Sequence, residues 1–187
     1  MPRQKIFLLV LLLILTFFLS FPGYTYAAQI ESIGIRGGIN LEQVSFPPAE
    51  KIDFYQADVF ITFALPWSLQ YSSGWEASWR VNTSAGILRG GGDTAFVAEL
   101  GPGIAFRKPD WRVIADIGTG LAALSRQHFG SQDMGGPIQI VGHGGVGFDL
   151  GSNLVLGWRF HHISDATMYG SHSKGVDINF LELGYHF

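Results

Sequence analysis

Hydrophobic and polar side chains alternate along most of this chain, and the alternation breaks where Gly, Pro, Asn, Asp and Ser gather. Such alternation is the pattern of a β-strand whose two faces meet different surroundings. The pattern predicts eight strands, at about Ile30 to Ile39, Phe54 to Leu65, Ser68 to Asn82, Thr94 to Arg107, Trp111 to Leu124, Ile138 to Leu150, Asn153 to Ser164 and Val176 to Phe187. Most of these strands reach the roughly 9 to 11 residues that a tilted strand needs to cross a bilayer.

The two faces of the predicted strands differ in the same way throughout the chain. One face is aliphatic or aromatic, and the other carries charges of both signs, at Glu76, Arg80, Glu99, Arg112, Asp116 and Arg159. Membrane barrels turn their apolar face to lipid, and a barrel of about eight strands has an interior filled by side chains. The sequence therefore favours an all-β fold, an eight-stranded antiparallel transmembrane β-barrel of the outer membrane. The alternative is a soluble lipocalin-like barrel or β-sandwich, whose apolar face points inward.

The predicted connections alternate between short and long, which indicates how the strands cross the membrane. The tight turns are Pro66 with Trp67, Lys108 to Asp110, and Gly151 with Ser152, and the long loops are Asn40 to Asp53, Thr83 to Asp93, Ser125 to Pro137 and Asp165 to Gly175. Short periplasmic turns and long outer loops are typical of outer-membrane barrels. The terminal Phe187, two residues after Tyr185, is similar to the C-terminal signal of proteins inserted by the outer-membrane assembly machinery.

The start of the chain has the order of a secretory signal. Arg3 and Lys5 precede an apolar run from Ile6 to Phe21, and small residues follow up to Ala27 and Ala28. A charged start, an apolar core and a small-residue cleavage site define a signal peptide, and the apolar run is shorter than the roughly 20 residues of a spanning helix. We expect residues 1–28 to be the signal peptide, cleaved near Ala27 or Ala28, and residues 29–187 to form one barrel domain in the outer membrane of a Gram-negative bacterium.

Composition narrows the classes of function. The chain has no Cys, so a disulfide framework and a thiol nucleophile are excluded. A net charge of -3 with dispersed basic residues offers no surface for nucleic acid. His143, His172 and His186 share no ligand spacing, so we expect no metal.

Three residues at the ends of the last two predicted strands carry the candidate chemistry. His162 and Ser164 are two residues apart and share the face of Trp158, while Asp177 begins the next strand on the matching face. Cross-strand neighbours lie roughly 5 Å apart at Cβ, so the carboxylate can approach the imidazole. Ser, His and Asp together are the parts of a nucleophilic hydrolase, here facing lipid. The alternative is that they mark the polar rim where a barrel strand leaves the bilayer.

The same segments carry a resemblance to a known family. The residues from Phe160 to Ala166 (FHHISDA), Gly175 to Asp177 (GVD) and Leu183 to Phe187 (LGYHF) resemble outer-membrane lipid A 3-O-deacylases of the PagL type, in the acyloxyacyl hydrolase family. That family is an eight-stranded barrel with a serine-histidine-acid triad on its outer surface, and it hydrolyses the ester-linked acyl chain at the 3-position of lipid A. The resemblance implies Ser164 as nucleophile, His162 as general base and Asp177 as the orienting acid, with no cofactor.

The sequence departs from this family at two positions. Asp165 follows the nucleophile where the family usually has Asn, and Asp177 stands where the best-known acid is Glu. A carboxylate would repel a developing oxyanion, so the backbone amides of Asp165 and Ala166 are the expected oxyanion donors, and Asp165 is a competing acid.

We therefore expect an outer-membrane esterase that removes the 3-position acyl chain of lipid A, or lipopolysaccharide, from the outer leaflet. The alternative is a noncatalytic small barrel with a structural or adhesive role, for which Asn40 to Asp53 is the candidate loop. Outer-membrane lipids are the expected surroundings, and the sequence leaves open whether the barrel forms a homodimer.

Overall fold

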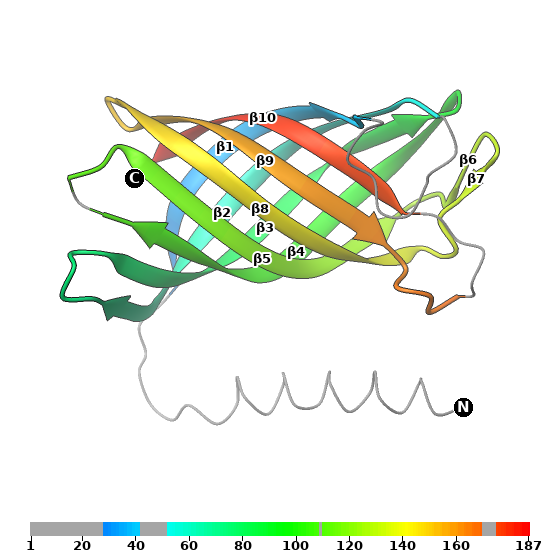
Figure 1. Cartoon of the computed structure of the whole chain (residues 1–187). Helices are drawn as coiled ribbons and strands as arrows, with labels where there is room; N and C mark the ends of the chain where they lie inside the picture. Colours follow the sequence, from blue (N-terminus) through cyan, green and yellow to red (C-terminus); the bar gives the residue numbers. More distant parts are fainter. Residues whose placement is uncertain (1–27, 42–51, 109, 170–174) are drawn as a thin grey trace.

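Eight long antiparallel strands close into a barrel, as the alternation predicts (Figure 1). The computed structural model describes residues 28–41, 52–108, 110–169 and 175–187. The barrel strands are β1 (Gln29–Ile39), β2 (Phe54–Gln70), β3 (Glu76–Gly90), β4 (Asp93–Arg107), β5 (Val113–Leu124), β8 (Ile138–Gly151), β9 (Leu154–Ser164) and β10 (Val176–His186). Each strand pairs with its neighbour along the chain, and β1 pairs with β10 to close the barrel. The predicted signal peptide, Ala28 excepted, lies outside the described residues.

The two ends of the barrel differ, and we name them by their connections. The turn end carries the β2–β3, β4–β5 and β8–β9 turns and both ends of the barrel sequence, Gln29 and Phe187. The loop end carries the β1–β2, β5–β8 and β9–β10 connections (Figure 1). Within the β5–β8 connection, β6 (His128–Phe129) and β7 (Gln132–Asp133) form a small hairpin that the sequence analysis did not predict.

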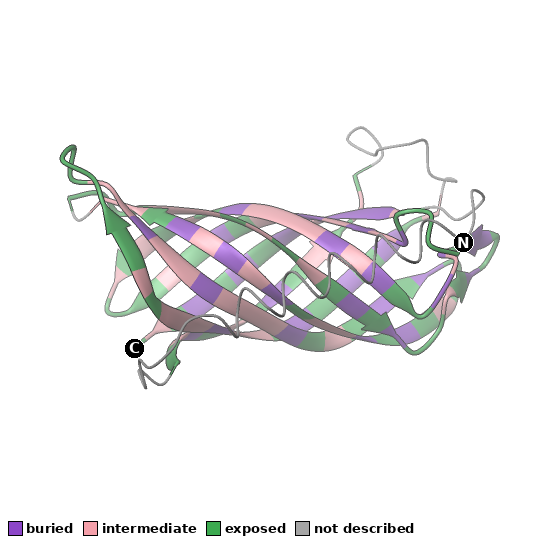
Figure 2. Cartoon of the chain, turned by 90° about the horizontal axis from the view of Figure 1, so that it is seen from below, coloured by how far each residue is buried: buried purple, intermediate pink, exposed green. Residues whose placement is uncertain are grey.

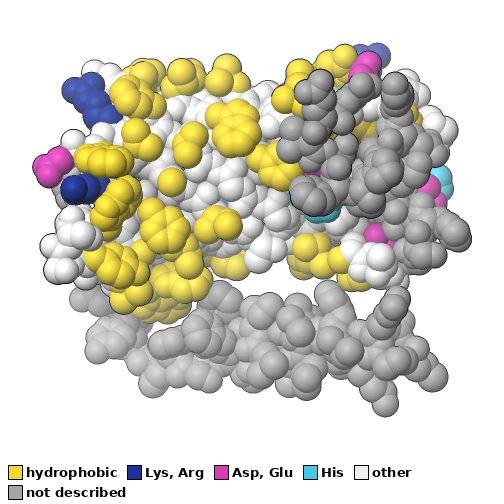
Figure 3. Space-filling model, in the orientation of Figure 1, with side chains coloured by type: hydrophobic (Ala, Val, Ile, Leu, Met, Phe, Trp, Pro, Cys, Tyr) yellow, Lys and Arg dark blue, Asp and Glu magenta, His cyan; other side chains and the backbone are white. Residues whose placement is uncertain are grey.

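The outer surface of the barrel is apolar, which confirms the membrane interpretation of the alternation. Ile35, Leu100 and Leu181 are 61 to 63% exposed, whereas Arg36 on β1 and Glu182 on β10 are each 8% exposed. Buried and exposed positions follow one another along the strands in Figure 2, and Figure 3 shows hydrophobic side chains across the visible face with charges near the two ends. Among the described residues, no helix is long and apolar enough to cross a bilayer.

A network of charges fills the middle of the barrel. Its members are Arg36, Asp58, Ser84, Glu99, Asp116, Arg159, His161 and Glu182. Arg36 donates to Asp58 Oδ2 at 2.8 Å and to Glu99 Oε2 at 2.7 Å. Arg159 joins Asp116 and Glu182 in the same way. Opposite charges that share hydrogen bonds offset the cost of their burial, so the interior is packed, as predicted for eight strands.

Three of the six charges predicted inside do not join this network. Arg80 is buried, but it pairs with Glu31 at 2.8 Å. Arg112 is exposed in the β4–β5 turn, because that turn runs on past Trp111, whose amide donates to Lys108 O at 2.9 Å. Glu76 is half-buried at the start of β3 and makes no ion pair within the described part of the chain. The alternation of hydrophobic and polar residues continues into the β4–β5 turn, so the alternation alone does not locate the end of a strand.

The predicted turn at Pro66 and Trp67 is wrong, because both residues lie within β2. The strand continues to Gln70, and its pairing with β3 is interrupted only between Ala64 and Ser68. Proline has no amide hydrogen, and a strand accommodates it where the ladder of hydrogen bonds is broken.

The predicted long loop from Thr83 to Asp93 is also wrong. β3 continues to Gly90, and only Gly91 and Gly92 connect it to β4, with φ angles of 56° and 87°. Glycine tolerates this left-handed backbone without a steric cost. Gly86 lies within this segment, and a Cβ at this position would lie 2.0 Å from a backbone oxygen of β2, so the strand itself requires glycine.

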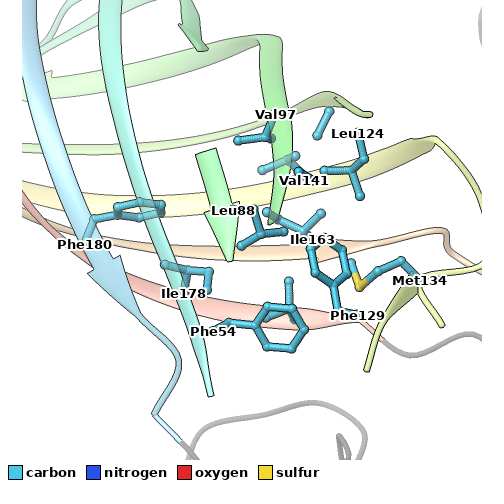
Figure 4. Packing of buried hydrophobic residues seen from close by; sticks show 13 residues of the cluster. Phe54, Leu88, Val97, Leu124, Phe129, Met134, Val141, Ile163, Ile178 and Phe180 are labelled. Atoms are coloured by element: carbon cyan, nitrogen blue, oxygen red, sulfur yellow. The ribbon is translucent and has the colours of Figure 1, made fainter. Parts of the chain in front are cut away.

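An apolar plug fills the loop end of the barrel. It consists of Phe54, Leu88, Ala95, Val97, Ala122, Leu124, Phe129, Met134, Val141, Ile163, Val176, Ile178 and Phe180. Phe129 and Met134 come from the β5–β8 connection and are fully buried against the strand residues (Figure 4). The ring of Phe129 meets that of Phe54 edge to face, with centroids 5.4 Å apart. The β6–β7 hairpin is therefore a packed cover of the barrel mouth.

Candidate active site

The pairing of β9 with β10 brings the predicted site residues together on the outer face of the barrel, at the loop end. β9 and β10 pair with His162 opposite Asp177 and Ile163 opposite Val176. Ser164 ends β9, one step beyond. Because alternate residues share a face, His162, Ser164 and Asp177 all point away from the interior. The cross-strand approach predicted from the sequence is thus present in the register.

His162 and Asp177 are joined directly. Nδ1–H of His162 donates to Asp177 Oδ1, with 2.5 Å between the two atoms. The imidazole is 32% exposed, while the carboxylate is only 3% exposed. A buried carboxylate that holds Nδ1 fixes the tautomer and leaves Nε2 as the nitrogen that accepts a proton.

Ser164 lies next to His162 across from Gly175. A Cβ placed on Gly175 would lie 3.0 Å from Ser164 Cβ and 3.2 Å from His162 Cε1, so both side chains border the same small space. Within the described residues, the Ser164 hydroxyl makes no hydrogen bond. Hydrogen bonds between catalytic groups are often long without substrate and shorten when it binds.

The Asp165 carboxylate accepts hydrogen bonds from backbone amides of the turn that follows it. Oδ1 accepts from the Thr167 amide at 2.9 Å, and Oδ2 accepts from the Tyr169 amide at 3.2 Å. Ala166 and Thr167 follow with φ angles of 46° and 65°, a conformation that non-glycine residues adopt at a cost. The side chain that the sequence offered as a competing acid is 4% exposed and shapes the backbone directly after Ser164.

Three other histidines, His143, His161 and His186, lie away from this site. His161 and His143 face the interior, where Arg36 donates to His161 and Arg159 contacts His143. His172 lies outside the described residues, and His186 ends β10 at the turn end.

Sequence reasoning missed two residues near the site, Gly175 and Gln132. Gln132 Nε2 donates to Gly175 O at 3.0 Å, across 43 residues of sequence. Gly130 with Ser131 between Phe129 and Gln132 is a two-residue hairpin signal that could have located β6 and β7. No local signal indicates the bond to Gly175.

Comparison with known proteins agrees with the resemblance in the motifs. The family model described as lipid A 3-O-deacylase (PagL) matches residues 55–186. The crystal structure of the outer membrane enzyme PagL matches with a TM-score of 0.65 and 14% identity, over 82% of this chain and 99% of that chain. The backbone structure of the Yersinia pestis outer membrane protein Ail in a phospholipid bilayer nanodisc matches with a TM-score of 0.47 and 13% identity, over 84% of this chain and 99% of that chain. No curated protein shows significant sequence similarity to this chain.

Proposed function

This chain belongs to the lipid A 3-O-deacylase (PagL) family and is an ester hydrolase, and we propose that Ser164, His162 and Asp177 carry out its reaction. The main support is the Asp177–His162 hydrogen bond of 2.5 Å at the loop end of the outer face. A serine hydroxyl is a weak nucleophile until a base takes its proton, and a carboxylate on the far nitrogen supports that base. His162 has such a carboxylate and borders Ser164.

The reaction proceeds through an acyl-enzyme. Ser164 Oγ attacks the ester carbonyl carbon while His162 Nε2 takes the hydroxyl proton. The tetrahedral adduct collapses, the 3-oxygen of lipid A leaves with that proton, and the acyl group stays on Ser164. His162 then removes a proton from water, the resulting hydroxide attacks the acyl group, and the fatty acid leaves as Oγ regains a proton.

The oxyanion of each adduct requires hydrogen-bond donors, and the backbone amides of Asp165 and Ala166 are our candidates. The Asp165 carboxylate already accepts from two amides of the following turn, so it is held by that turn. The strained φ angles at Ala166 and Thr167 support this assignment, because such strain gathers at functional sites.

The substrate enters sideways from the outer leaflet of the outer membrane of a Gram-negative bacterium. Phe160 and Trp158 lie on the same face of β9 as His162, one and two steps further into the bilayer respectively, and Trp158 is 48% exposed. Acyl chains beside these rings would place the ester bond near Ser164. Export by a cleaved signal peptide, residues 1–28, is part of this proposal.

The test is loss of deacylation in Ser164→Ala. Lipid A from cells that express the wild-type protein is expected to lose its 3-position acyl chain by mass spectrometry, and Ser164→Ala is expected to leave it intact. The matched control is Ser72→Ala, an exposed serine in the β2–β3 turn. Both variants should keep the gel shift between boiled and unboiled samples that marks a folded barrel. Intact lipid A with folded wild-type protein would support the noncatalytic alternative.

A further inference from the structure

A buried glutamine interrupts the apolar plug. Gln132 is 1% exposed, on the same hairpin as Phe129 and Met134, which are both fully buried. Its Oε1 makes no hydrogen bond among the described residues. A buried amide oxygen without a partner opposes folding, and an apolar side chain of similar length would avoid that cost. A polar residue in such a place indicates a role other than packing.

The Nε2 group of the Gln132 amide suggests what this role is. Gln132 Nε2 donates to Gly175 O at 3.0 Å. Gly175 immediately precedes β10, and continuing the pairing of Val176 with Ile163 by one step places it opposite Ser164. Asp177 follows two residues later. The bond therefore ties the β6–β7 hairpin to the start of the strand that carries the acid.

Gly175 itself is in close contact with the site. A Cβ at this position would lie 2.9 Å from Ile163 O, in addition to its short distances to Ser164 and His162. The Gly175 backbone is thus one wall of the space that the nucleophile and the base share. A displacement of this wall changes how those two side chains face each other.

The hairpin is held firmly enough to act as a support. Gln139 Nε2 donates to Met134 O at 3.0 Å, and the Gly130 amide donates to Asp93 Oδ2 at 3.0 Å. Phe129 is packed against Phe54 inside the barrel mouth (Figure 4). These contacts come from β8, β4 and β2. The hairpin is therefore fixed relative to the barrel wall, and through Gln132 it fixes Gly175 as well.

We propose that Gln132 is a positioning residue of the active site, which fixes the start of β10 against Ser164 and His162 by holding the Gly175 carbonyl. This inference rests on the deacylase mechanism proposed above. Gln132 is buried and does not touch the substrate, so its removal should lower kcat and leave KM unchanged. Misplacing reacting groups by about 1 Å can cost on the order of 10²-fold in rate.

The first variant is Gln132→Met, which keeps the length of the side chain and removes the donor. We expect kcat for lipid A hydrolysis in detergent to fall by about tenfold or more, with KM within about twofold of wild type. The urea midpoint of unfolding should not decrease, because the buried unpaired Oε1 is removed at the same time. A residue with only a structural role would show the opposite result, lower stability with unchanged kcat.

The second variant is Gly175→Ala, whose added methyl group displaces the Gly175 backbone from Ser164 and His162. This variant tests the proposal if Gln132→Met does not fold. We expect a similar fall in kcat. Its matched control is Gly142→Ala, on β8 opposite His162, where an added Cβ would meet nothing within 4 Å. A control on the same hairpin is Ser131→Ala, an exposed serine of its turn that makes none of these contacts, and it should keep kcat near wild type.

Labelling of Ser164 by a fluorophosphonate separates the two proposals. Wild-type protein that neither deacylates lipid A nor reacts with the reagent refutes the proposed function. Active wild-type protein whose kcat and labelling rate are unchanged in Gln132→Met and Gly175→Ala refutes the role of Gln132. Equal losses in Gln132→Met and Ser131→Ala also refute it, because they would reflect a general effect of changes in the hairpin.

Discussion

His161 and His162 are neighbours in the chain, yet they occupy opposite faces of β9 and very different surroundings. His161 is 2% exposed, accepts from Arg36 Nη1 at 3.1 Å, and packs against the ring of Phe180. His162 is 32% exposed on the lipid side, and Asp177 accepts a hydrogen bond from its Nδ1. The His161 imidazole is buried in the interior charge network. The His162 imidazole is held at Nδ1 by Asp177, and its Nε2 is left to accept a proton.

This difference shows that chemistry here depends on the face of the strand rather than on residue type. A general base needs a partner that orients it and a nitrogen that can reach the substrate. His162 meets both needs, whereas the partners of His161 enclose it completely. Mutations of the two histidines should therefore have opposite effects on activity and stability.

The largest expected effect is loss of activity in His162→Ala. We expect kcat for release of 3-hydroxy fatty acid to fall by at least about 10³-fold, and the double variant with Ser164→Ala to lose little more. Members of one catalytic unit are strongly non-additive, because each needs the other. His128→Ala, in the exposed part of the β6–β7 hairpin, is the control. Losses that multiply in the double variant would show that the two residues act independently.

The next largest effect is expected for Asp177, whose carboxylate orients His162. Asp177→Asn retains a hydrogen-bond acceptor near Nδ1 but removes the charge that stabilises the imidazolium. We expect kcat to fall by about 10²- to 10⁴-fold. Asp177→Glu should recover part of this loss, because it restores the charge. Activity of Asp177→Asn near that of wild type would exclude Asp177 as the orienting acid.

His161→Ala should have the opposite profile, with a clear loss of stability. The variant removes the acceptor of Arg36 and leaves a cavity beside Phe180. We expect the free energy of unfolding to fall by about 2 to 4 kcal/mol, measured in urea by loss of the gel shift. kcat of the folded fraction should remain near wild type. A collapse of kcat without loss of stability would contradict the division between the two faces.

The sequence predicts most of this arrangement, because the alternation is local. It placed His162 on the outer face, His161 on the inner face, and Asp177 beside His162 in the next strand. It failed where residue type and conformation conflict, as at Pro66 within β2 and Gly86 within β3. These residues usually mark turns, and only pairing with a neighbouring strand explains why they lie in a strand here.

Contacts between distant segments could not be predicted in this way. The Gln132 bond to Gly175 joins a loop hairpin to the start of β10, and nothing in either segment indicates the other. The role of Asp165 was open for a similar reason. Its position after Ser164 suits either an acid or a turn, and only the folded backbone shows which amides its carboxylate reaches.

The smallest expected effect is that of Asp165→Asn, which sharpens the contrast with Asp177. The amide oxygen of Asn still accepts from Thr167, so only the hydrogen bond from the Tyr169 amide is lost. We expect kcat to fall by less than about tenfold, the equivalent of one ordinary hydrogen bond. The assay is the same release of fatty acid in detergent, compared directly with Asp177→Asn.

Asp165→Ala is the matching control, because it removes both acceptors and frees the backbone that follows Ser164. Its loss should exceed that of Asp165→Asn, since the candidate oxyanion amides are then no longer held by the turn. If the charge of Asp165 rather than its turn were needed, Asp165→Asn and Asp165→Ala would lose activity equally. A loss in Asp165→Asn larger than that in Asp177→Asn would transfer the role of orienting acid from Asp177 to Asp165.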